Sequence, residues 1–295
     1  MIVATTIRYR SYAKLNLYLD VLARRRDGYH NIETIFQTVG LADGLSFVEQ
    51  RSGVSVVCSA PELQHTESNL VHRAALLLRE RSGCRLGARI HLEKRIPIAA
   101  GLAGGSGNAA ATLVALNLLW DLRLPGGQIR RLALELGSDV PYCTVGGTVA
   151  GTRRGEEMWP LTPLGVTWFV LVHPPISVSA RGAYNSPLLG RSGEKAFAGR
   201  TGSLRRAIRA LARDDLAGVV FNRMEGAVFG THRGLAEAKE KLLDHGCVAA
   251  AMSGSGPTLF GVCRTRQEAR QCAEAFGEYD TSVVRSVPSA LERVQ

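Results

Sequence analysis

Residues 96–111 read IPIAAGLAGGSGNAAA, a run of small residues that leads directly into a helical pattern. Beyond it, Leu113, Leu116, Leu119 and Trp120 recur at helical spacing, which predicts an amphipathic helix over residues 109–120. The glycines therefore lie at the N-terminus of a helix, where backbone N–H groups lack intrahelical partners and the helix dipole is positive. Such a helix end is suited to bind phosphate, although Gly-rich turns before helices also occur as simple packing turns.

This Gly-rich loop differs from the common nucleotide-binding motifs. A Walker A loop ends in Gly-Lys-Ser/Thr, whereas the nearest lysine here, Lys94, precedes the loop. The run also does not spell G-x-G-x-x-G. Other segments must therefore decide between phosphate binding and packing.

The composition is that of an ordinary globular protein. The 295 residues are 45% hydrophobic and 21% charged, which allows two packed domains or one large one. The sequence contains no apolar run long enough to span a membrane and no signal-peptide pattern at its start, so we expect a cytoplasmic protein without a membrane partner. The six cysteines form no C-x-x-C pair and have no histidine at zinc-ligand spacing, which predicts reduced thiols and no protein-held metal.

The net charge of +10 is compatible with nucleic acid or with a highly charged small substrate. Most of the 36 basic residues are arginines spread along the chain, apart from the short run at residues 24–26. Because a nucleic-acid patch is usually more concentrated, we expect no nucleic-acid partner.

Strands and helices alternate irregularly along the chain, which favours an α+β fold with a boundary near residues 150–160. In the first strand, residues 13–20, apolar and polar residues alternate, so Lys14 and Asn16 point the same way. Further strands are predicted at 32–39, 45–48, 54–58, 88–92, 147–151, 168–172, 248–252, 258–262 and near 283. Helices are predicted at 69–81, 128–136, 203–212, 215–229, 235–245 and 267–276, and an exposed loop at 185–202.

Three features match the needs of phosphoryl transfer: Lys14 with Asn16 on a strand, the Gly-rich loop, and Asp139 in the sequence GSDVP. The loop would hold phosphates, the ammonium would offset charge on the transferring group, and the carboxylate would accept the proton of the attacking hydroxyl. Each feature also has an ordinary explanation. Lys14 taken alone is a solvent-facing strand residue, and Asp139 is a helix N-cap.

Four segments, two of which contain the residues just named, make the combination more specific: SYAKLNL at 11–17, DGYH at 27–30, GSDVPY at 137–142 and MSGSGPT at 252–258. Together they resemble the GHMP kinase superfamily, and within it the kinases of a cytidine diphosphate sugar alcohol. The resemblance covers nearly the whole chain in the right order. It implies a two-domain α+β protein with a ribosomal protein S5 domain 2-like half over residues 1–155. A ferredoxin-like α/β sandwich would follow over 156–295, with the active site in the cleft between the two.

The resemblance also implies roles for individual residues. Asp139 would act as general base and Lys14 would steady the developing charge. Asn16, Tyr29 and His30 would contact the substrate, and Tyr184 would supply an aromatic face to the cytosine. ATP would bind at Asn69, Pro97, Gly101, Leu102, Ala103, Gly104, Gly105, Ser106, Gly107 and Asn108. Gly254, Ser255 and Gly256 would shape the cleft, and Mg²⁺ would accompany ATP with few protein ligands of its own.

The implied reaction is ATP-dependent phosphorylation of the 2-hydroxyl of the sugar alcohol in the non-mevalonate route of isoprenoid biosynthesis, by a monomer or homodimer. One alternative is a homoserine or mevalonate kinase-like enzyme, against which DGYH argues, although Asp-Gly is also a hairpin signal. The other is a catalytically silent nucleotide- or nucleic-acid-binding protein, against which the presence of both Lys14 and Asp139 argues. Several residues depart from the expected pattern. Gly107 stands where many members have Ser or Ala, Ala103 where some have Gly, and Arg223 where an acidic residue is expected. Arg181 and Gly182 also lie in a segment that usually reads Ser-Thr-Ala followed by Glu.

Overall fold

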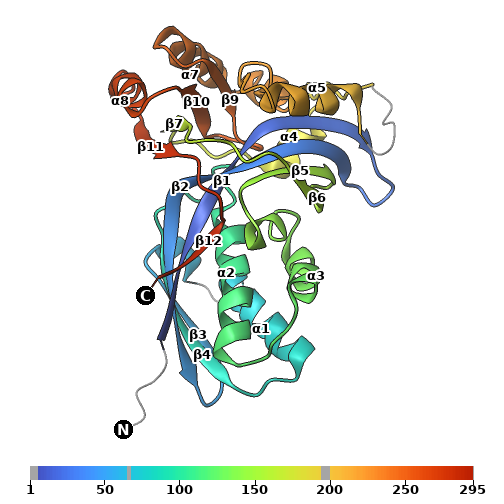
Figure 1. Ribbon diagram of the computed structural model, residues 1–295, viewed down its shortest axis with the longest axis vertical. Helices are drawn as coiled ribbons and strands as arrows, with labels where there is room; N and C mark the ends of the chain where they lie inside the picture. Colours follow the sequence, from blue (N-terminus) through green and yellow to red (C-terminus); the bar gives the residue numbers. More distant parts are fainter. Residues whose placement is uncertain (1–5, 65–67, 194–199, 295) are drawn as a thin grey trace.

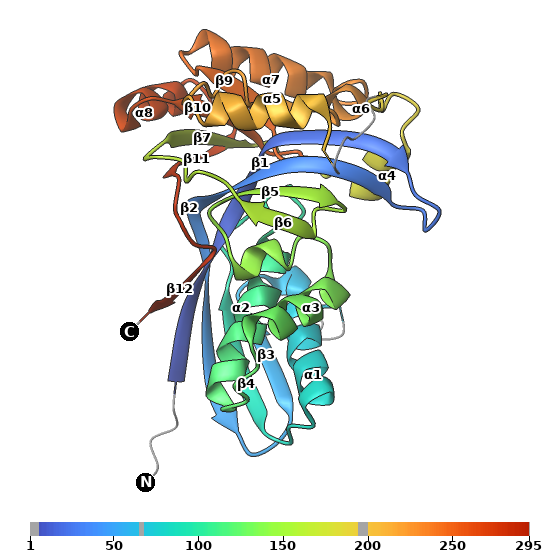
Figure 2. The ribbon, with the colours of Figure 1, turned by 45° about the vertical axis from the view of Figure 1, so that its right-hand side comes forward.

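The computed structural model describes residues 6–64, 68–193 and 200–294. The fold is α+β, as predicted, with a large mixed sheet at one end and a smaller antiparallel sheet at the other (Figure 1). Helices cover one face of each sheet (Figure 2). Within the described ranges, no helix is both long and apolar enough to cross a membrane. All six cysteines are free, which confirms the predicted thiols.

The large sheet is built on one long hairpin. Its strands follow the order β12-β1-β2-β4-β3, with β5 on β2, β6 on β5 and a short β8 parallel to β1. The strands are β1 (Thr6–Arg24), β2 (His30–Gln50), β3 (Val54–Cys58), β4 (Gly87–Glu93), β5 (Thr148–Arg153), β6 (Glu157–Pro160), β8 (Phe221–Asn222) and β12 (Leu291–Val294). Residues 32–48, predicted as two strands, form a single strand, because β2 pairs with β1 across a register irregularity instead of breaking.

Helix α2 carries the Gly-rich run and lies in the centre of this half. It extends over Gly104–Leu119 and packs between the sheet, α1 (Leu70–Ser82) and α3 (Gly126–Leu136) (Figure 2). Eleven of its sixteen residues are buried, the polar Asn108 and Thr112 among them, so the prediction of an amphipathic helix is wrong. A helix enclosed on most sides is apolar around its circumference, and its alanines allow neighbouring elements to approach closely.

The start of α2 also differs from the predicted residue 109. Residues 104–108 form its first helical turn, although glycine is a poor helix former. Gly104 is buried against Ile96, and Gly107 lies beside Ser11, where a Cβ would come within 2.4 Å of the hydroxyl oxygen. Tertiary packing of the small residues therefore outweighs their low helix propensity.

The second half has the topology of a ferredoxin-like sandwich. Its sheet order is β11-β7-β10-β9, the spatial order 4-1-3-2 of a βαββαβ unit. The strands are β7 (Trp168–His173), β9 (Ala249–Met252), β10 (Leu259–Cys263) and β11 (Asp280–Arg285). The helices are α4 (Ala180–Asn185), α5 (Gly202–Leu211), α6 (Glu225–Phe229), α7 (Arg233–Asp244) and α8 (Arg266–Glu274).

Two segments of this half depart from prediction. Residues 215–229 do not form one helix: turns lead to β8 and then to the short α6. The reason is tertiary, because the Asn222 side chain donates hydrogen bonds to two backbone carbonyls of a distant loop. The predicted loop at 185–202 is preceded by an unpredicted helix, α4, and residues 194–199 of that loop lie outside the described residues.

The β1–β2 hairpin joins the two halves physically. Ala13, Leu15 and Leu17 of β1 share a buried cluster with Phe169 and Phe260 of the smaller sheet. The N-terminal hairpin thus contributes to the core of the C-terminal half (Figure 1). The boundary at residues 155 and 156 stays a prediction.

A buried carboxylate fixes the chain that enters the Gly-rich run. Asp43 is fully buried and accepts hydrogen bonds from the Lys94 ammonium and from the backbone N–H groups of Arg95 and Ile96, the latter two at 2.7 and 2.8 Å. The Lys94 side chain is itself buried. Removal of the carboxylate would therefore leave a buried charge without its partner.

We expect Asp43→Ala to lower the free energy of unfolding by about 3–5 kcal/mol, the usual loss when one partner of a buried ion pair is removed. Urea denaturation measures this. Asp121→Ala, which removes an exposed partner of Arg123, is the matched control and should have little effect. Similar losses in the two variants would contradict the structural role of Asp43.

Candidate active site

A cavity of about 790 Å³ lies where the predicted motifs meet. Its walls come from β1, the β1–β2 turn, the Gly-rich run, the segment after α3, α4 and the loop between β9 and β10. The predicted site residues that line it are Lys14, Asn16, Tyr29, His30, Gly101, Ala103, Ser106, Asp139, Tyr184, Gly254 and Ser255. The structure therefore brings together residues from all of the motifs.

Lys14 is the buried charge at the inner end of this cavity. Its ammonium donates hydrogen bonds to Asn16 Oδ1 at 2.6 Å and to the Gly101 carbonyl at 3.0 Å, and it lies 3.7 Å from Asp139 Oδ2. Lys14 and Asn16 share one side of β1, as the alternation predicted. The ammonium and the carboxylate converge although they come from distant parts of the chain.

The orientation of Asn16 is set by a short chain of hydrogen bonds. Asn16 Nδ2 donates to Thr34 Oγ1 at 2.8 Å, and the Thr34 hydroxyl donates to the Tyr18 carbonyl at 2.8 Å. This leaves the amide oxygen of Asn16 to accept from Lys14. The ammonium is thereby held in one place.

Asp139 faces the cavity with about a third of its side chain exposed. It lies in the turn between α3 and a short 3-10 helix, Tyr142–Thr144. Within the described part of the chain, no side chain caps that helix, whose N-cap residue is Pro141. The N-cap alternative for Asp139 is therefore wrong, and its carboxylate is free to meet a ligand.

The loop between β9 and β10 closes the cavity beside Lys14. Gly254 has a φ of +58°, which favours glycine, and a Cβ there would be crowded, at 3.3 Å from Lys14 Nζ. Asn222 Nδ2 donates to the carbonyls of Met252 and Gly254 at 2.6 and 2.8 Å and holds the loop there. Sequence reasoning missed this positioning role of Asn222.

The Gly-rich run has a backbone conformation suited to binding an anion. Ala99, Gly101 and Ala103 have φ values of 54°, 77° and 55°, so every second residue takes the left-handed conformation. Such alternation turns successive N–H groups toward one side and makes an anion-binding concavity. Among the residues that the structure describes, no side chain caps α2. The N–H groups of its first turn are thus open to a phosphate.

Several residues predicted for ATP lie outside the cavity lining. Asn69 is buried as the N-cap of α1: its Oδ1 accepts from Val71 N, and its Nδ2 donates to the Leu63 carbonyl. The others outside the lining are Pro97, Leu102, Gly104, Gly105, Gly107 and Asn108, together with the loop residue Gly256. Their contact with ATP or substrate stays a prediction.

An aromatic pair occupies the wall beyond Asn16. The rings of His30 and Tyr184 stack with centroids 5.5 Å apart and an interplanar angle of 14°. Burial lowers the pKa of His30, and the positive charges of Arg191 and Arg24 lower it further. His30 Nε2 is buried and has no hydrogen-bond partner within the described residues. The ring is therefore neutral at neutral pH and has an unused nitrogen.

The cavity also contains residues that sequence reasoning did not assign. Arg24, Arg154 and Arg181 line it, as do Ser138 and Asn185. The run of arginines at residues 24–26 was a sequence signal that could have identified Arg24. Arg154 and Arg181 carried no local signal, because only the folded chain brings them to the cavity.

Arg223, which stands where an acidic residue is expected, does not line the cavity. Its Nε lies 2.7 Å from Asp20 Oδ1, and Asp20 is completely buried in β1. The reversed charge at 223 is therefore balanced by a carboxylate that would otherwise be buried without a cation.

Comparisons with known proteins agree with this geometry. Residues 69–147 match the family model of the GHMP kinases N terminal domain, and residues 194–280 match that of the GHMP kinases C terminal region. A 4-diphosphocytidyl-2-C-methyl-D-erythritol kinase from Moorella thermoacetica is 42% identical over 282 residues, which span 93% of this chain and 96% of that protein.

Solved structures extend the comparison. A crystal structure of 4-(cytidine 5'-diphospho)-2C-methyl-D-erythritol kinase has a TM-score of 0.79 and 32% identity, and covers 95% of this chain and 98% of that one. A homoserine kinase from Cytophaga hutchinsonii shares the fold with a TM-score of 0.76 at 19% identity, covering 100% of this chain and 99% of its own. On the combined evidence of sequence identity and matched domains, the chain belongs to the 4-diphosphocytidyl-2-C-methyl-D-erythritol kinase family of the GHMP kinases.

Proposed function

We propose that the protein transfers the γ-phosphoryl group of ATP to the 2-hydroxyl of 4-diphosphocytidyl-2-C-methyl-D-erythritol, giving the 2-phosphate and ADP. The reaction belongs to the non-mevalonate route of isoprenoid biosynthesis. The main support for the proposal is that the Lys14 ammonium lies 3.7 Å from the Asp139 carboxylate. Both line a cavity that is bounded by a helix N-terminus without a side-chain cap. We also propose that the protein acts in the cytoplasm as a monomer or homodimer.

Asp139 is the proposed general base. Its carboxylate accepts the proton of the 2-hydroxyl as the oxygen attacks phosphorus. Lys14 cannot swing away, because Asn16 and the Gly101 carbonyl hold its ammonium. The ammonium therefore meets the developing negative charge without reorganisation, which is the main source of electrostatic catalysis.

Phosphate binding is assigned to the backbone of the Gly-rich run. The N–H groups at the start of α2 donate to phosphate oxygens, and the helix dipole favours their negative charge. The Ser106 hydroxyl on the cavity wall is a further donor.

Mg²⁺ is proposed to enter with ATP. The described residues contain no cluster of three or more acidic, histidine or cysteine side chains that could hold a metal by themselves. The cavity nevertheless offers oxygen donors of the kind that Mg²⁺ prefers, the Asp139 carboxylate and the Ser106 hydroxyl. When bound, the ion neutralises charge on the β- and γ-phosphates.

Turnover of the cytidyl substrate is the direct test. Purified protein with ATP, Mg²⁺ and 4-diphosphocytidyl-2-C-methyl-D-erythritol should release ADP and form a single phosphomonoester. Homoserine and mevalonate should not be phosphorylated at comparable rates. Preference for either of them would replace the proposed substrate and leave a GHMP-type kinase.

Asp139→Asn should lower kcat by roughly two to four orders of magnitude, because the amide cannot take the hydroxyl proton. The Kd for ATP should change little. Steady-state kinetics and calorimetric titration measure the two quantities, and Asp121→Asn serves as an exposed control remote from the cavity. Wild-type turnover in Asp139→Asn would remove this residue from the mechanism.

The lowered pKa of His30 predicts a pH dependence of substrate affinity. His30 is neutral above that pKa, which lies below the usual 6.5, and a neutral imidazole keeps one ring nitrogen as a hydrogen-bond acceptor for the cytosine amino group. As the pH falls through the lowered pKa, protonation removes this acceptor. KM for the cytidyl substrate should then rise at acid pH while KM for ATP stays level, and His30→Gln should flatten the profile. An identical profile in His30→Gln would assign the titration to another group.

A further inference from the structure

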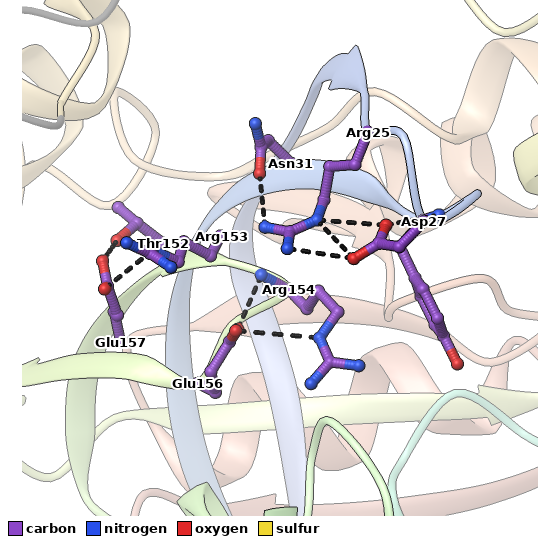
Figure 3. Close-up of polar contacts among 9 residues, drawn as sticks. Arg25, Asp27, Asn31, Thr152, Arg153, Arg154, Glu156 and Glu157 are labelled. Carbon is purple, nitrogen blue, oxygen red and sulfur yellow. Dashed lines mark hydrogen bonds and ion pairs between the residues drawn. The ribbon is translucent and has the colours of Figure 1, made fainter.

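Tyr29 lies at the tip of the β1–β2 hairpin, where a side chain is least constrained by packing. Its side chain is 55% exposed, although it lines the cavity. The backbone of the turn is held from within, because Arg25 N donates to the Tyr29 carbonyl at 2.7 Å and Tyr29 N donates to Asp27 Oδ1 at 3.1 Å. Arg25 also binds the Asp27 carboxylate (Figure 3). These contacts fix the main chain but not the ring.

One side chain from another element reaches the Tyr29 ring. The guanidinium carbon of Arg154 lies 5.0 Å from the ring centroid, within the range of a cation–π contact. Arg154 follows β5, whose last residue, Arg153, is paired in register with Ile32 of β2. The contact therefore joins the hairpin tip to a firmly placed neighbouring strand.

Glu156 holds Arg154 in this position. Glu156 Oε2 accepts a hydrogen bond from the backbone N–H of Arg154 at 2.7 Å, and Oε1 lies 3.7 Å from Arg154 Nε (Figure 3). Only about a quarter of the Arg154 side chain is exposed. Arg154 is one of the residues that line the cavity.

We propose that Arg154 is a positioning residue that holds the Tyr29 ring by covering one of its faces and leaves the other face for the cytosine of the substrate. The inference rests on the proposed function. A ring held in place loses less rotational freedom when the base stacks on it, so the contact strengthens substrate binding without touching the reacting atoms.

The adjacent arginine provides a matched control. Arg153 lies on the other side of the strand end, where its Nε is 2.7 Å from Glu157 Oε1, and its side chain is 57% exposed (Figure 3). It does not line the cavity. Arg153→Gln and Arg154→Gln remove the same group one residue apart, but only the second removes the contact with Tyr29.

The kinetic test compares both variants with wild type. Arg154→Gln should raise KM for the cytidyl substrate about 3- to 30-fold, the range expected for one cation–π contact, while kcat and KM for ATP stay within twofold. Arg154→Lys should recover part of the loss, because it retains the cation but not the planar stack. Arg153→Gln should behave as wild type.

A double-mutant cycle separates positioning from direct substrate contact. If Arg154 acts through Tyr29, Arg154→Gln should add nothing in a Tyr29→Leu background. Additive losses would mean that Arg154 binds the substrate by itself, which would overturn the positioning role.

A measurement without substrate keeps this inference distinct from the proposed function. In protein labelled with 3-fluorotyrosine, Tyr29→Phe identifies the ¹⁹F resonance of Tyr29. Arg154→Gln should shift this resonance, and Arg153→Gln should not. If the resonance does not shift and KM stays at the wild-type value in Arg154→Gln, the inference is wrong. Turnover of the substrate by the wild-type protein would still support the proposed function. If the resonance shifts but the wild-type protein does not turn over the substrate, the proposed function is wrong, whereas the contact between Arg154 and Tyr29 is confirmed.

Discussion

The burial of one ammonium group determines how the site is built. Lys14 lies inside the protein, where an unpaired cation is costly, so its ammonium needs oxygens that accept its hydrogen bonds or balance its charge. Those oxygens come from Asn16 on the same strand, from the Gly101 carbonyl and from Asp139 after α3. These three oxygens belong to separate segments of the chain. The contacts of the ammonium with them therefore also fix the distance between the Gly-rich run and the Asp139 carboxylate. The same contacts that stabilise the buried charge thus define a phosphoryl-transfer site.

Side chains away from the reaction keep the surrounding backbone in place. Asp43 binds the N–H groups that lead into the Gly-rich run, and Asn222 binds two carbonyls of the loop that closes over Lys14. Arg154 contacts the tip of the β1–β2 hairpin in a similar way, because its guanidinium lies over the ring of Tyr29. In each case a side chain from one element fixes a neighbouring loop through polar or aromatic contacts. The long β1–β2 hairpin, whose inner part packs into the smaller sheet, carries this arrangement across both halves of the molecule.

Prediction from sequence succeeded where local pattern and tertiary packing agree. The helices at 69–81 and 128–136 and the strand at 54–58 lie where periodicity placed them, as do the two polar residues on one side of β1. It failed where distant contacts outweigh local preference. Buried glycines begin α2 earlier than their propensity allows, and the bonds made by Asn222 replace the helix expected over 215–229 with turns, β8 and α6.

The sequence alone determined the α+β class, the order of the motifs and the residue types needed for phosphoryl transfer, because these depend on periodicity and on side-chain chemistry. Only the tertiary structure decided that Lys14 and Asp139 lie 3.7 Å apart and that Asn69 caps a helix outside the cavity lining. It alone brought Arg154 to Tyr29. The physical reason is that distances between residues far apart in the chain depend on how strands pair and how buried groups find their partners, and neither is encoded in any single segment.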